Sequence, residues 1–516
     1  MSYPLFIFQH KKLLLGLFLG LILFIGIFIR LYSLGTQSLW IDEGYSINAS
    51  LAIQEHGYPL LDSNLIYRQG LTGLEYLTAF TMKVFHFNPF SPWSARLPSV
   101  VFGVLVIVAS FLITREIFSS SAISWVTSIL LTFSTWEIAW SRQARGYIAL
   151  QFFIIISFYF FWKWLQDQSW KNFVLSILSF ILAFLSHTIA FIFIPVFIVI
   201  YILHIILHPE KRLSLKNSVV AGVTAIILVA VIFWFTKANI GGYDYSKVYL
   251  TYLFKELLLA SVLSIMAIIV GIFSKINFWP TIFMASIIFI PLMIVMEYGQ
   301  AAQIRYLFPV FPFMVILVAY LISTAVKWCA EQTIKYSNPQ SKIVSLLSFP
   351  VSINIISVIL GLILFGSYLT FIPTSTYNLE WDSPQPDFKS TYSIVKDTKK
   401  VDDLVISSYT MMSKIYLGES GIWLPISLTG KTSELEQSLS EGKDYYTGAP
   451  LIANKEQLTN ILDKKKGFIV IDKMASIRLM GQFDFIATYP TVHEIYKSGT
   501  GLDEIQLYYF EPKKHI

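Results

Sequence analysis

The chain has 516 residues, of which 55% are hydrophobic, 16% aromatic and only 14% charged. Soluble domains carry about a quarter of charged residues, so this composition, with a mean hydropathy of +0.62, excludes a soluble protein and indicates one that crosses a membrane many times. The net charge of +6 is modest, and lysines in cytoplasmic loops explain it better than nucleic-acid binding. The single cysteine, Cys329, excludes an internal disulfide and a cysteine-rich metal site.

The first apolar segment covers residues 13–32 and follows Lys11 and Lys12. It is too long for the apolar core of a signal peptide and lacks a small-residue cleavage site, so we expect it to be retained as a span. Lysines before it and acids after it place the N-terminus in the cytoplasm. The next stretch, residues 38–45, then lies outside the cytoplasm.

Two amphipathic pieces, residues 47–56 and 71–86, come next. Neither is long or apolar enough to span, so both are predicted to be interfacial helices in the first outer loop. Ten further apolar segments follow, each approaching the length needed to cross ~30 Å of hydrocarbon. They cover residues 97–118, 122–136, 147–164, 173–186, 189–207, 219–235, 250–273, 279–296, 306–326 and 344–369. The predicted fold class is an α-helical polytopic membrane protein with about eleven transmembrane helices.

The topology can be tested against the distribution of positive charge. Lysines and arginines fall in the loops assigned to the cytoplasm, as the positive-inside rule requires. An odd number of spans puts the C-terminal part outside the cytoplasm. The predicted location is therefore the plasma membrane, with an active site and C-terminal domain that are extracytoplasmic.

Composition changes at Pro373, beyond which polar residues and glycines become common. The predicted domains are therefore 1–372, a transmembrane catalytic domain, and 373–516, a small soluble extracytoplasmic α/β domain. Strand-like runs cover residues 404–407, 468–471, 485–488 and 505–510, and helical candidates cover 411–417, 455–464 and 473–480. This alternation is typical of a Rossmann-like domain. It has no glycine-rich phosphate fingerprint, so no nucleotide is expected.

Polar and aromatic side chains gather at the predicted outer ends of several spans. They are Trp40, Asp42, Glu43, Tyr45, Arg142, Arg145, Tyr147, His187, Arg305 and Tyr306. Each has an ordinary structural alternative: an acidic turn, a snorkelling arginine, an interfacial histidine or an aromatic-belt anchor. Their convergence on one side of the membrane favours a site.

The chemistry of such a site can be argued from the residue types. Nucleotide sugars and ATP are cytoplasmic, so a transferase outside the cytoplasm needs a donor delivered through the bilayer, such as a polyprenyl-phosphate sugar. Arginine suits its phosphate oxygens, and a loop Asp can serve as general base for the acceptor hydroxyl. Displacement by one carboxylate predicts inversion, because retention would use a second one as nucleophile.

Five motifs resemble those of GT-C glycosyltransferases, in particular glycosyltransferase family 39, which includes protein O-mannosyltransferases and the lipid A aminoarabinose transferase. They are Trp40-Ile-Asp42-Glu43-Gly-Tyr45, Ser94-Ala-Arg96-Leu-Pro98-Ser99, Arg142-Gln-Ala-Arg145-Gly-Tyr147, Leu185-Ser-His187 and Arg305-Tyr306-Leu-Phe-Pro309. The resemblance covers roughly residues 10–370 and rests on the order of the motifs more than on any one of them. It implies a GT-C-like fold.

The resemblance also implies roles for individual residues. Asp42 matches the catalytic base and Glu43 its partner in shaping the loop. The expected donor-phosphate ligands are Arg142, Arg145, Arg305 and Tyr306, and the expected substrate-binding residues are Trp40, Tyr45, Tyr147 and His187. No cofactor or metal is required, although Asp42 and Glu43 could hold a divalent cation. The expected partners are the bilayer, a polyprenyl-phosphate sugar and an acceptor that is a lipid, glycan or protein.

Two departures from the family pattern bear on the acceptor. Residues 67–69 lack the usual proline-rich approach to the second interfacial helix, and the C-terminal part does not resemble the MIR repeats of eukaryotic O-mannosyltransferases. A protein acceptor is therefore not assumed. Two rival functions stay open: a flippase or transporter for lipid-linked sugars, and a non-catalytic lipid-binding membrane protein. The scarcity of charge at mid-membrane argues against the transporter, and the intact base and arginines argue against the non-catalytic protein.

Overall fold

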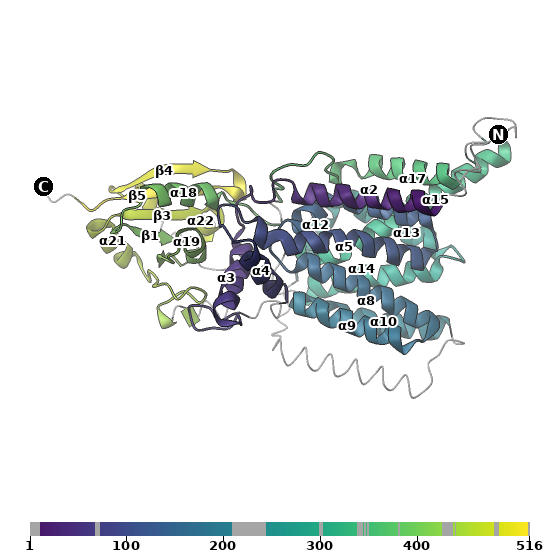
Figure 1. Cartoon of the computed structure of the whole chain (residues 1–516), viewed down its shortest axis with the longest axis horizontal. Helices are drawn as coiled ribbons and strands as arrows, with labels where there is room; N and C mark the ends of the chain where they lie inside the picture. Colours follow the sequence, from purple (N-terminus) through teal and green to yellow (C-terminus); the bar gives the residue numbers. More distant parts are fainter. Residues whose placement is uncertain are drawn as a thin grey trace.

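The computed structural model describes residues 11–67, 73–208, 244–298, 303–337, 344, 347, 350–379, 382–425, 437–438, 440–478 and 484–513. The molecule is elongated, with a helical bundle at one end and an α/β domain at the other (Figure 1).

Five helical segments among the described residues are long and apolar enough to cross a membrane, and a sixth results if two helices bent by 94° count as one. The five are α5 (Trp93–Phe118), α8 (Tyr147–Asp167), η2 with α10 (Thr188–Phe193 and Ile194–Leu207), α14 (Phe278–Tyr298), and η4 with α15 (Ile304–Val310 and Phe311–Tyr336). The bent pair is α12 (Ser246–Lys255) and α13 (Leu258–Ile272).

Four shorter apolar helices complete the described bundle: α2 (Lys11–Leu31), α6 (Ser121–Phe133), α9 (Trp170–Ser186) and α17 (Pro350–Leu364). Every predicted span that lies wholly on described residues contains a helix, so the helical membrane class is confirmed. The predicted span at 219–235 lies outside the described residues. The total of about eleven spans therefore stays a prediction.

Two predicted spans are each divided into two helices. An apolar run in the sequence indicates that a segment is away from water, but it does not show whether the helix is continuous. The segment 122–136 breaks at Ser134, whose extended backbone ends α6 and whose Oγ accepts a hydrogen bond from the Glu137 amide to start α7 (Thr135–Ser141). The segment 250–273 divides into α12 and α13, where Ser261 Oγ donates to the Leu253 carbonyl at 2.9 Å. Side-chain bonds of this kind replace the backbone partners that a continuous helix would supply.

The two predicted interfacial helices are present as α3 (Ile41–His56) and α4 (Gly73–Val84), which lie between the bundle and the α/β domain (Figure 1). Helix α3 begins earlier than predicted, so Asp42 and Glu43 occupy its first turn instead of a loop. The reason is local: Glu43 Oε2 accepts the Trp40 amide hydrogen at 3.0 Å, and acids in a first turn are favoured by the helix dipole.

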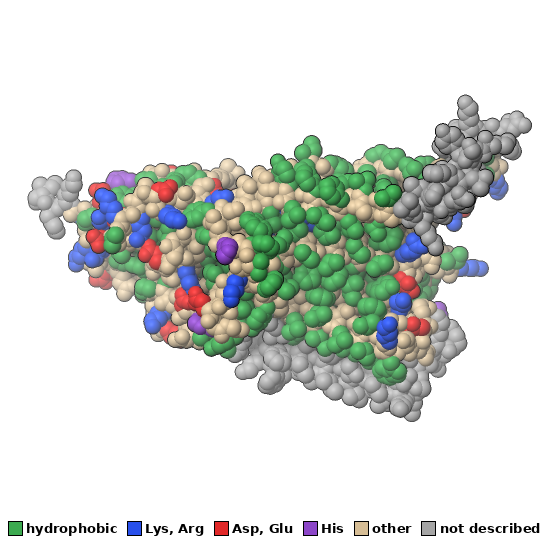
Figure 2. Space-filling view, viewed as in Figure 1, with side chains coloured by type: hydrophobic (Ala, Val, Ile, Leu, Met, Phe, Trp, Pro, Cys, Tyr) green, Lys and Arg blue, Asp and Glu red, His purple; other side chains and the backbone are tan. Residues whose placement is uncertain are grey.

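The surface of the bundle carries a broad apolar band, while charged side chains gather on the α/β domain and at the far end of the bundle (Figure 2). Large exposed apolar residues include Phe24 and Phe28 on α2, Leu178 and Leu182 on α9, and Ile359 and Ile363 on α17. Such a surface would be unfavourable in water and is favourable against hydrocarbon. The protein is thus a multi-pass membrane protein with water-facing ends.

The α/β domain contains a five-stranded mixed sheet in the order β2-β1-β3-β5-β4. Its strands are β1 (Leu404–Ser407), β2 (Ile422–Trp423), β3 (Gly467–Asp472), β4 (Val492–Ser498) and β5 (Ile505–Phe510). Strand β1 runs parallel to β2 and β3, whereas β5 runs antiparallel to β3 and β4. Helices α18 (Phe388–Thr398) and α19 (Thr410–Leu417) pack on one face and α21 (Lys455–Lys464) on the other.

The α/β class of this domain is confirmed, but several details predicted from the sequence are wrong. The run 485–488 belongs to a 3-10 helix, η6 (Asp484–Thr488), and the antiparallel β4–β5 pair departs from a Rossmann-like parallel sheet. Strands β2 and β4 and helix α18 were not expected. Strand β4 is mostly exposed and polar, and β2 has two residues, so neither carries an apolar run. The boundary at residue 373 stays a prediction.

The α/β domain is joined to the membrane domain by a shared apolar core. Met411 and Met412 of α19 pack with Ile47 of α3 and Leu39 before it. Gly44 permits this approach, since a Cβ there would lie 2.9 Å from atoms of both methionines. The first turn of α3 is therefore held against the soluble domain.

Candidate active site

Asp42 and Glu43 are adjacent on α3 but face different surroundings, because successive helical residues point about 100° apart. The Asp42 side chain is 23% exposed and lines a cavity, whereas the Glu43 side chain is 0% exposed. Of these two carboxylates, Asp42 alone can meet a substrate.

Glu43 is held in a buried network that fixes the start of α3. Arg96 Nε donates to Glu43 Oε1 and Arg96 Nη2 to Oε2, both at 2.8 Å. The amides of Ala144 and Trp40 donate to the same carboxylate at 2.8 and 3.0 Å. Glu43 therefore shapes the site. A divalent cation held by Asp42 and Glu43 stays a prediction. In the described part of the chain, no group of three His, Cys, Asp or Glu side chains could hold a metal ion.

Two of the three predicted arginines converge on Asp42. Arg305 Nη2 lies 3.2 Å from Asp42 Oδ2, and Arg145 Nη2 lies 3.7 Å from the same oxygen. Arg145 is also anchored by a 3.1 Å hydrogen bond to the Asp42 carbonyl, and the guanidinium of Arg305 lies over the Trp40 ring at 4.9 Å. Two guanidinium groups and one carboxylate thus meet at the edge of the cavity.

Arg142 is not among the arginines that contact Asp42 in the described part of the chain, and it lies against the chain beyond α2, so its expected role in binding a donor phosphate stays a prediction. Its Nη1 donates to the carbonyls of Arg30 and Tyr32 at 3.0 and 2.6 Å, and its Nη2 to those of Ser33 and Ser375 at 3.2 and 3.1 Å. It holds the chain beyond the end of α2. Helix α7 ends at Ser141 and α8 begins at Tyr147, so Arg142 and Arg145 stand on a turn and do not share a helical face.

Tyr147 and His187 stack at the base of the site, with ring centroids 4.5 Å apart. Tyr147 Oη accepts a hydrogen bond from Arg305 Nε at 3.3 Å, which links this pair to the arginines. Gly146 makes the approach feasible, because a Cβ there would lie 2.1 Å from the Ser186 carbonyl oxygen. The structure therefore brings together two residues expected to bind substrate from separate loops.

The remaining predicted residues occupy different positions. Trp40 and Tyr45 line the cavity that contains Asp42. Tyr306 is half-buried on η4 and is not among the residues that line this cavity. Its expected contact with a donor phosphate stays a prediction.

Asp382 is a site residue that sequence reasoning missed. Its Oδ2 accepts hydrogen bonds from the indole nitrogens of Trp136 and Trp140 at 2.8 and 2.9 Å, and its carbonyl accepts one from Arg305 Nη1 at 3.0 Å. Asp382 Oδ1 is buried without a hydrogen-bond partner among the described residues. A lone acid beyond the last span gave no sequence signal. Arg96 was quoted in a motif, but its pairing with Glu43 was not foreseen.

Burial shifts the pKa values of two site residues outside the spans, Asp382 and His187. Burial raises the pKa of Asp382 to about 6, against the opposing effect of Arg305. Burial, with the charges of Arg145 and Arg305, lowers the pKa of His187 to about 3. His187 is therefore neutral at physiological pH. Its Nδ1 accepts the Ile189 amide hydrogen at 3.1 Å, which leaves the imidazole proton on Nε2, where it can donate.

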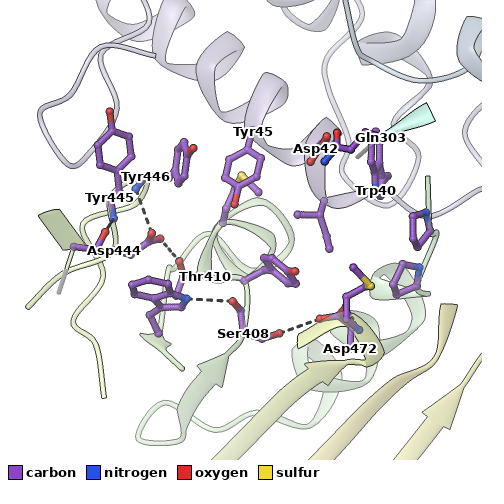
Figure 3. Close-up of a pocket in the computed structure, with 18 of the residues that line it drawn as sticks. Trp40, Asp42, Tyr45, Gln303, Ser408, Thr410, Asp444, Tyr445, Tyr446 and Asp472 are labelled. Atoms are coloured by element: carbon purple, nitrogen blue, oxygen red, sulfur yellow. Dashed lines mark hydrogen bonds between the residues drawn. The ribbon is translucent and has the colours of Figure 1, made fainter. Parts of the chain in front are cut away.

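The cavity lies between the bundle and the α/β domain and has a volume of about 280 Å³. Asp42, Trp40 and Gln303 lie at one side, and Ser408 and Asp472 lie at the opposite side (Figure 3). It can hold a ligand of small-molecule size, close to the lower limit of ~300 Å³ for such sites. One wall comes from each domain.

A comparison with protein families matches residues 73–235 to a family model described as "Dolichyl-phosphate-mannose-protein mannosyltransferase". This match covers less than half of the chain. No curated protein sequence matches the chain.

Solved structures share the whole fold. ArnT from Cupriavidus metallidurans in the apo state is similar with a TM-score of 0.61 and 13% identity, over 96% of this chain and 98% of that chain. The same protein bound to undecaprenyl phosphate gives a TM-score of 0.58 and 13% identity, over 95% and 98%. The archaeal oligosaccharyltransferase AglB from Archaeoglobus fulgidus, in complex with an inhibitory peptide and a dolichol-phosphate, gives 0.54 and 12%, over 90% and 70%.

The resemblance to GT-C glycosyltransferases is therefore confirmed, in fold over most of the chain and in sequence over residues 73–235. These findings define a multi-pass membrane protein with the ArnT-like fold, part of whose sequence matches a mannosyltransferase family model.

Proposed function

We propose that this protein transfers a sugar from a polyprenyl-phosphate carrier to an acceptor outside the cytoplasm. The observation that carries the proposal is the Asp42 carboxylate at the cavity edge, with Arg305 at 3.2 Å and Arg145 at 3.7 Å. Transfer of this kind needs a base for the acceptor and cations for the departing phosphate, and both stand together here.

A lipid carrier is supported by an apolar cavity beside the site. It has a volume of about 160 Å³ and is lined mainly by residues of α12, α13, α14 and η4. Trp136 contributes to its wall and also donates its indole hydrogen to Asp382, whose carbonyl binds Arg305. A polyprenyl tail in this cavity would bring its phosphate towards the arginines. The similar ArnT and AglB structures contain undecaprenyl phosphate and dolichol-phosphate, respectively.

Asp42 is the proposed general base. The contacts of its carboxylate with described residues go to Oδ2, so Oδ1 is left to face the acceptor hydroxyl. Asp42 takes the hydroxyl proton while the acceptor oxygen bonds to the anomeric carbon. The bond from that carbon to the phosphate oxygen breaks, and the electron pair leaves on polyprenyl phosphate.

Inversion at the anomeric carbon is expected because neither of the other two acids described at the membrane-domain side of the site is available as a nucleophile. Glu43 is locked by Arg96, and Asp382 is 4% exposed behind two indole rings. Neither can act as the nucleophile that a retaining route would use. The chemistry needs no metal ion, because fixed guanidinium groups can stabilise the charge that develops on the phosphate.

The proposed orientation places this site outside the cytoplasm. Helices α5, α8 and η4–α15 all begin near the site, so Arg115, Lys163 and Lys335 near their ends lie towards the opposite side of the bundle. The positive-inside rule assigns that side to the cytoplasm. The α/β domain is then extracytoplasmic.

The test is to incubate the purified protein in lipid nanodiscs with a panel of polyprenyl-phosphate sugars and an extract of cell-envelope glycans and lipids. One donor should be consumed, with release of polyprenyl phosphate and a product of inverted anomeric configuration by NMR. Arg305→Ala should lower the rate on the order of 10²–10³-fold, because it removes a phosphate-binding cation. Arg115→Ala, which changes an exposed arginine on α5, is the matched control and should leave the rate unchanged. Equal rates in both variants would contradict the proposal.

A further inference from the structure

The cavity wall formed by the α/β domain has no part in the donor chemistry described above. Residues of this wall follow or end three neighbouring parallel strands: Ser408 after β1, Trp423 at the end of β2 and Asp472 at the end of β3. The carboxyl ends of parallel strands meet at one edge of a sheet, and α/β domains bind ligands in the crevice beyond that edge. Here this edge opens towards Asp42.

Aromatic rings dominate this wall and are held in place. The Trp423 indole nitrogen donates to the Ser408 carbonyl at 3.2 Å, which fixes the plane of a half-buried ring. Tyr446 packs against Tyr45 of α3 with ring centroids 4.2 Å apart. Tyr45 is three residues from Asp42 on the same helix, so a ring face and the proposed base belong to one rigid element. These rings offer flat apolar surfaces at fixed positions.

Oxygen atoms lie between the rings. Asp444 accepts hydrogen bonds from the hydroxyls of Thr410 and Thr447 at 2.5 and 2.6 Å and from the amide of Tyr446 at 3.2 Å. Asp472 accepts one from the Ser408 hydroxyl at 3.3 Å and one from the Met474 amide at 3.1 Å. A carboxylate has about four acceptor sites, so Asp444, with three donors, retains capacity for a further one. Both acids are among the residues that line the cavity (Figure 3).

The wall is poor in positive charge. Among the described residues that line the cavity, Arg305 is the only cation, and it lies against Asp42 at the membrane-domain side. A phosphate group on the acceptor would meet carboxylates that repel it at the α/β side, where no described residue lining the cavity is a cation. The aromatic rings of this wall can stack on the apolar C–H faces of a ligand, and its carboxylates can accept hydrogen bonds from hydroxyl groups. Both features suit a neutral polyol with flat faces.

We propose that the carboxyl edge of the β1–β2–β3 sheet is an acceptor subsite for a neutral saccharide, which presents one of its hydroxyl groups to Asp42. The inference rests on the proposed function for its catalytic part, but saccharide binding can be measured without the donor. The α/β domain is then the element that selects the acceptor. In the reaction, the saccharide hydroxyl loses its proton to Asp42, its oxygen bonds to the donor's anomeric carbon, and polyprenyl phosphate leaves.

The first experiment measures binding of neutral disaccharides to the full-length protein in nanodiscs, by saturation-transfer NMR and calorimetry. The panel carries terminal hexoses and N-acetylhexosamines, and it is compared with a Ser/Thr-rich peptide and with glucosamine 1-phosphate. At least one neutral disaccharide should bind saturably. Trp423→Ala should weaken this binding about 10-fold, as expected for loss of a stacking ring. Trp423→Phe should restore most of it.

Matched variants separate a binding role from a folding role. Trp328→Ala removes a tryptophan that is 61% exposed on α15 and should change neither binding nor stability. If Trp423→Ala proves unstable in thermal unfolding, Tyr446→Ala removes a second ring of the same wall and should weaken disaccharide binding on its own. Neither variant should change the affinity for the polyprenyl-phosphate sugar, which binds at the arginine side.

The outcomes distinguish the two proposals. Disaccharide binding without transfer from any donor would contradict the proposed function and leave the saccharide subsite standing. Transfer to the peptide or to glucosamine 1-phosphate, with no saturable binding of any neutral disaccharide, would overturn the subsite and leave the transferase standing. Disaccharide binding that Trp423→Ala and Tyr446→Ala both leave unchanged would also overturn it.

Discussion

The two walls of the cavity differ in the kind of chemistry they offer. The membrane-domain wall is ionic: Asp42 lies between Arg145 and Arg305, which belong to separate segments of the bundle. The α/β wall is aromatic and rich in oxygen, with Trp423 and Asp472 at the carboxyl ends of strands. Charge at one wall suits a phosphate leaving group, and rings at the other suit a hydroxylated acceptor.

The difference also shows how buried charge is used in this fold. Glu43 has both carboxylate oxygens paired with Arg96, whereas Asp42 keeps one oxygen available at the cavity. A similar contrast separates Arg142, whose Nη1 and Nη2 donate to backbone carbonyls, from Arg305, whose Nη2 reaches Asp42. Position on the first turn of α3 decides which of two neighbouring acids can react.

The largest expected effect on stability comes from breaking the ionic support of the membrane-domain wall. Glu43→Gln leaves the guanidinium of Arg96 buried without its counter-charge, which costs about 3–5 kcal/mol. The measurement is the free energy of unfolding in detergent. Glu55→Gln changes an acid on the same helix whose side chain is 70% exposed, and it should shift the free energy by less than about 0.5 kcal/mol. Equal stability of the two variants would show that Glu43 does not hold the wall.

Much of this wall could be predicted from the sequence, because apolar spans set the topology and the topology decides which ends meet. Asp42, Arg145 and Arg305 were assigned to one side of the membrane and do converge. Arg142 could not be placed, since its expected partner Arg145 would share its face only if the helix continued past Ser141.

The α/β wall was largely hidden from the sequence. Its residues come from short loops after strands, and which loops meet depends on the order of strands in the sheet. Strand β2 has two residues, so its end at Trp423 carries no pattern that marks a strand. Asp382 was missed for a related reason. Its partners Trp136 and Trp140 are 246 and 242 residues away in the sequence, so only the folded structure brings them together.

A smaller effect concerns Asp382, where the two walls join. Its pKa is raised by burial from 3.8 to about 6, so the folded protein holds this proton more tightly than the unfolded chain. Protonated Asp382 therefore adds up to roughly 3 kcal/mol to the free energy of unfolding below pH 4. This contribution is lost as the pH rises through about 6. Asp382→Asn removes this titration and still offers an oxygen to an indole hydrogen.

The measurement is the unfolding free energy of both proteins from pH 4 to pH 7. The wild type should lose stability relative to Asp382→Asn as pH rises across this range. A difference between the two proteins that does not change with pH would mean that Asp382 does not titrate there.

The most direct test of the account is the Asp42→Asn variant, assayed with the donor that the wild-type protein consumes. The variant should keep its fold and bind the polyprenyl-phosphate sugar, while transfer falls on the order of 10²–10⁴-fold, the range expected for loss of a general base. Transfer at the wild-type rate by a folded Asp42→Asn protein would contradict the account.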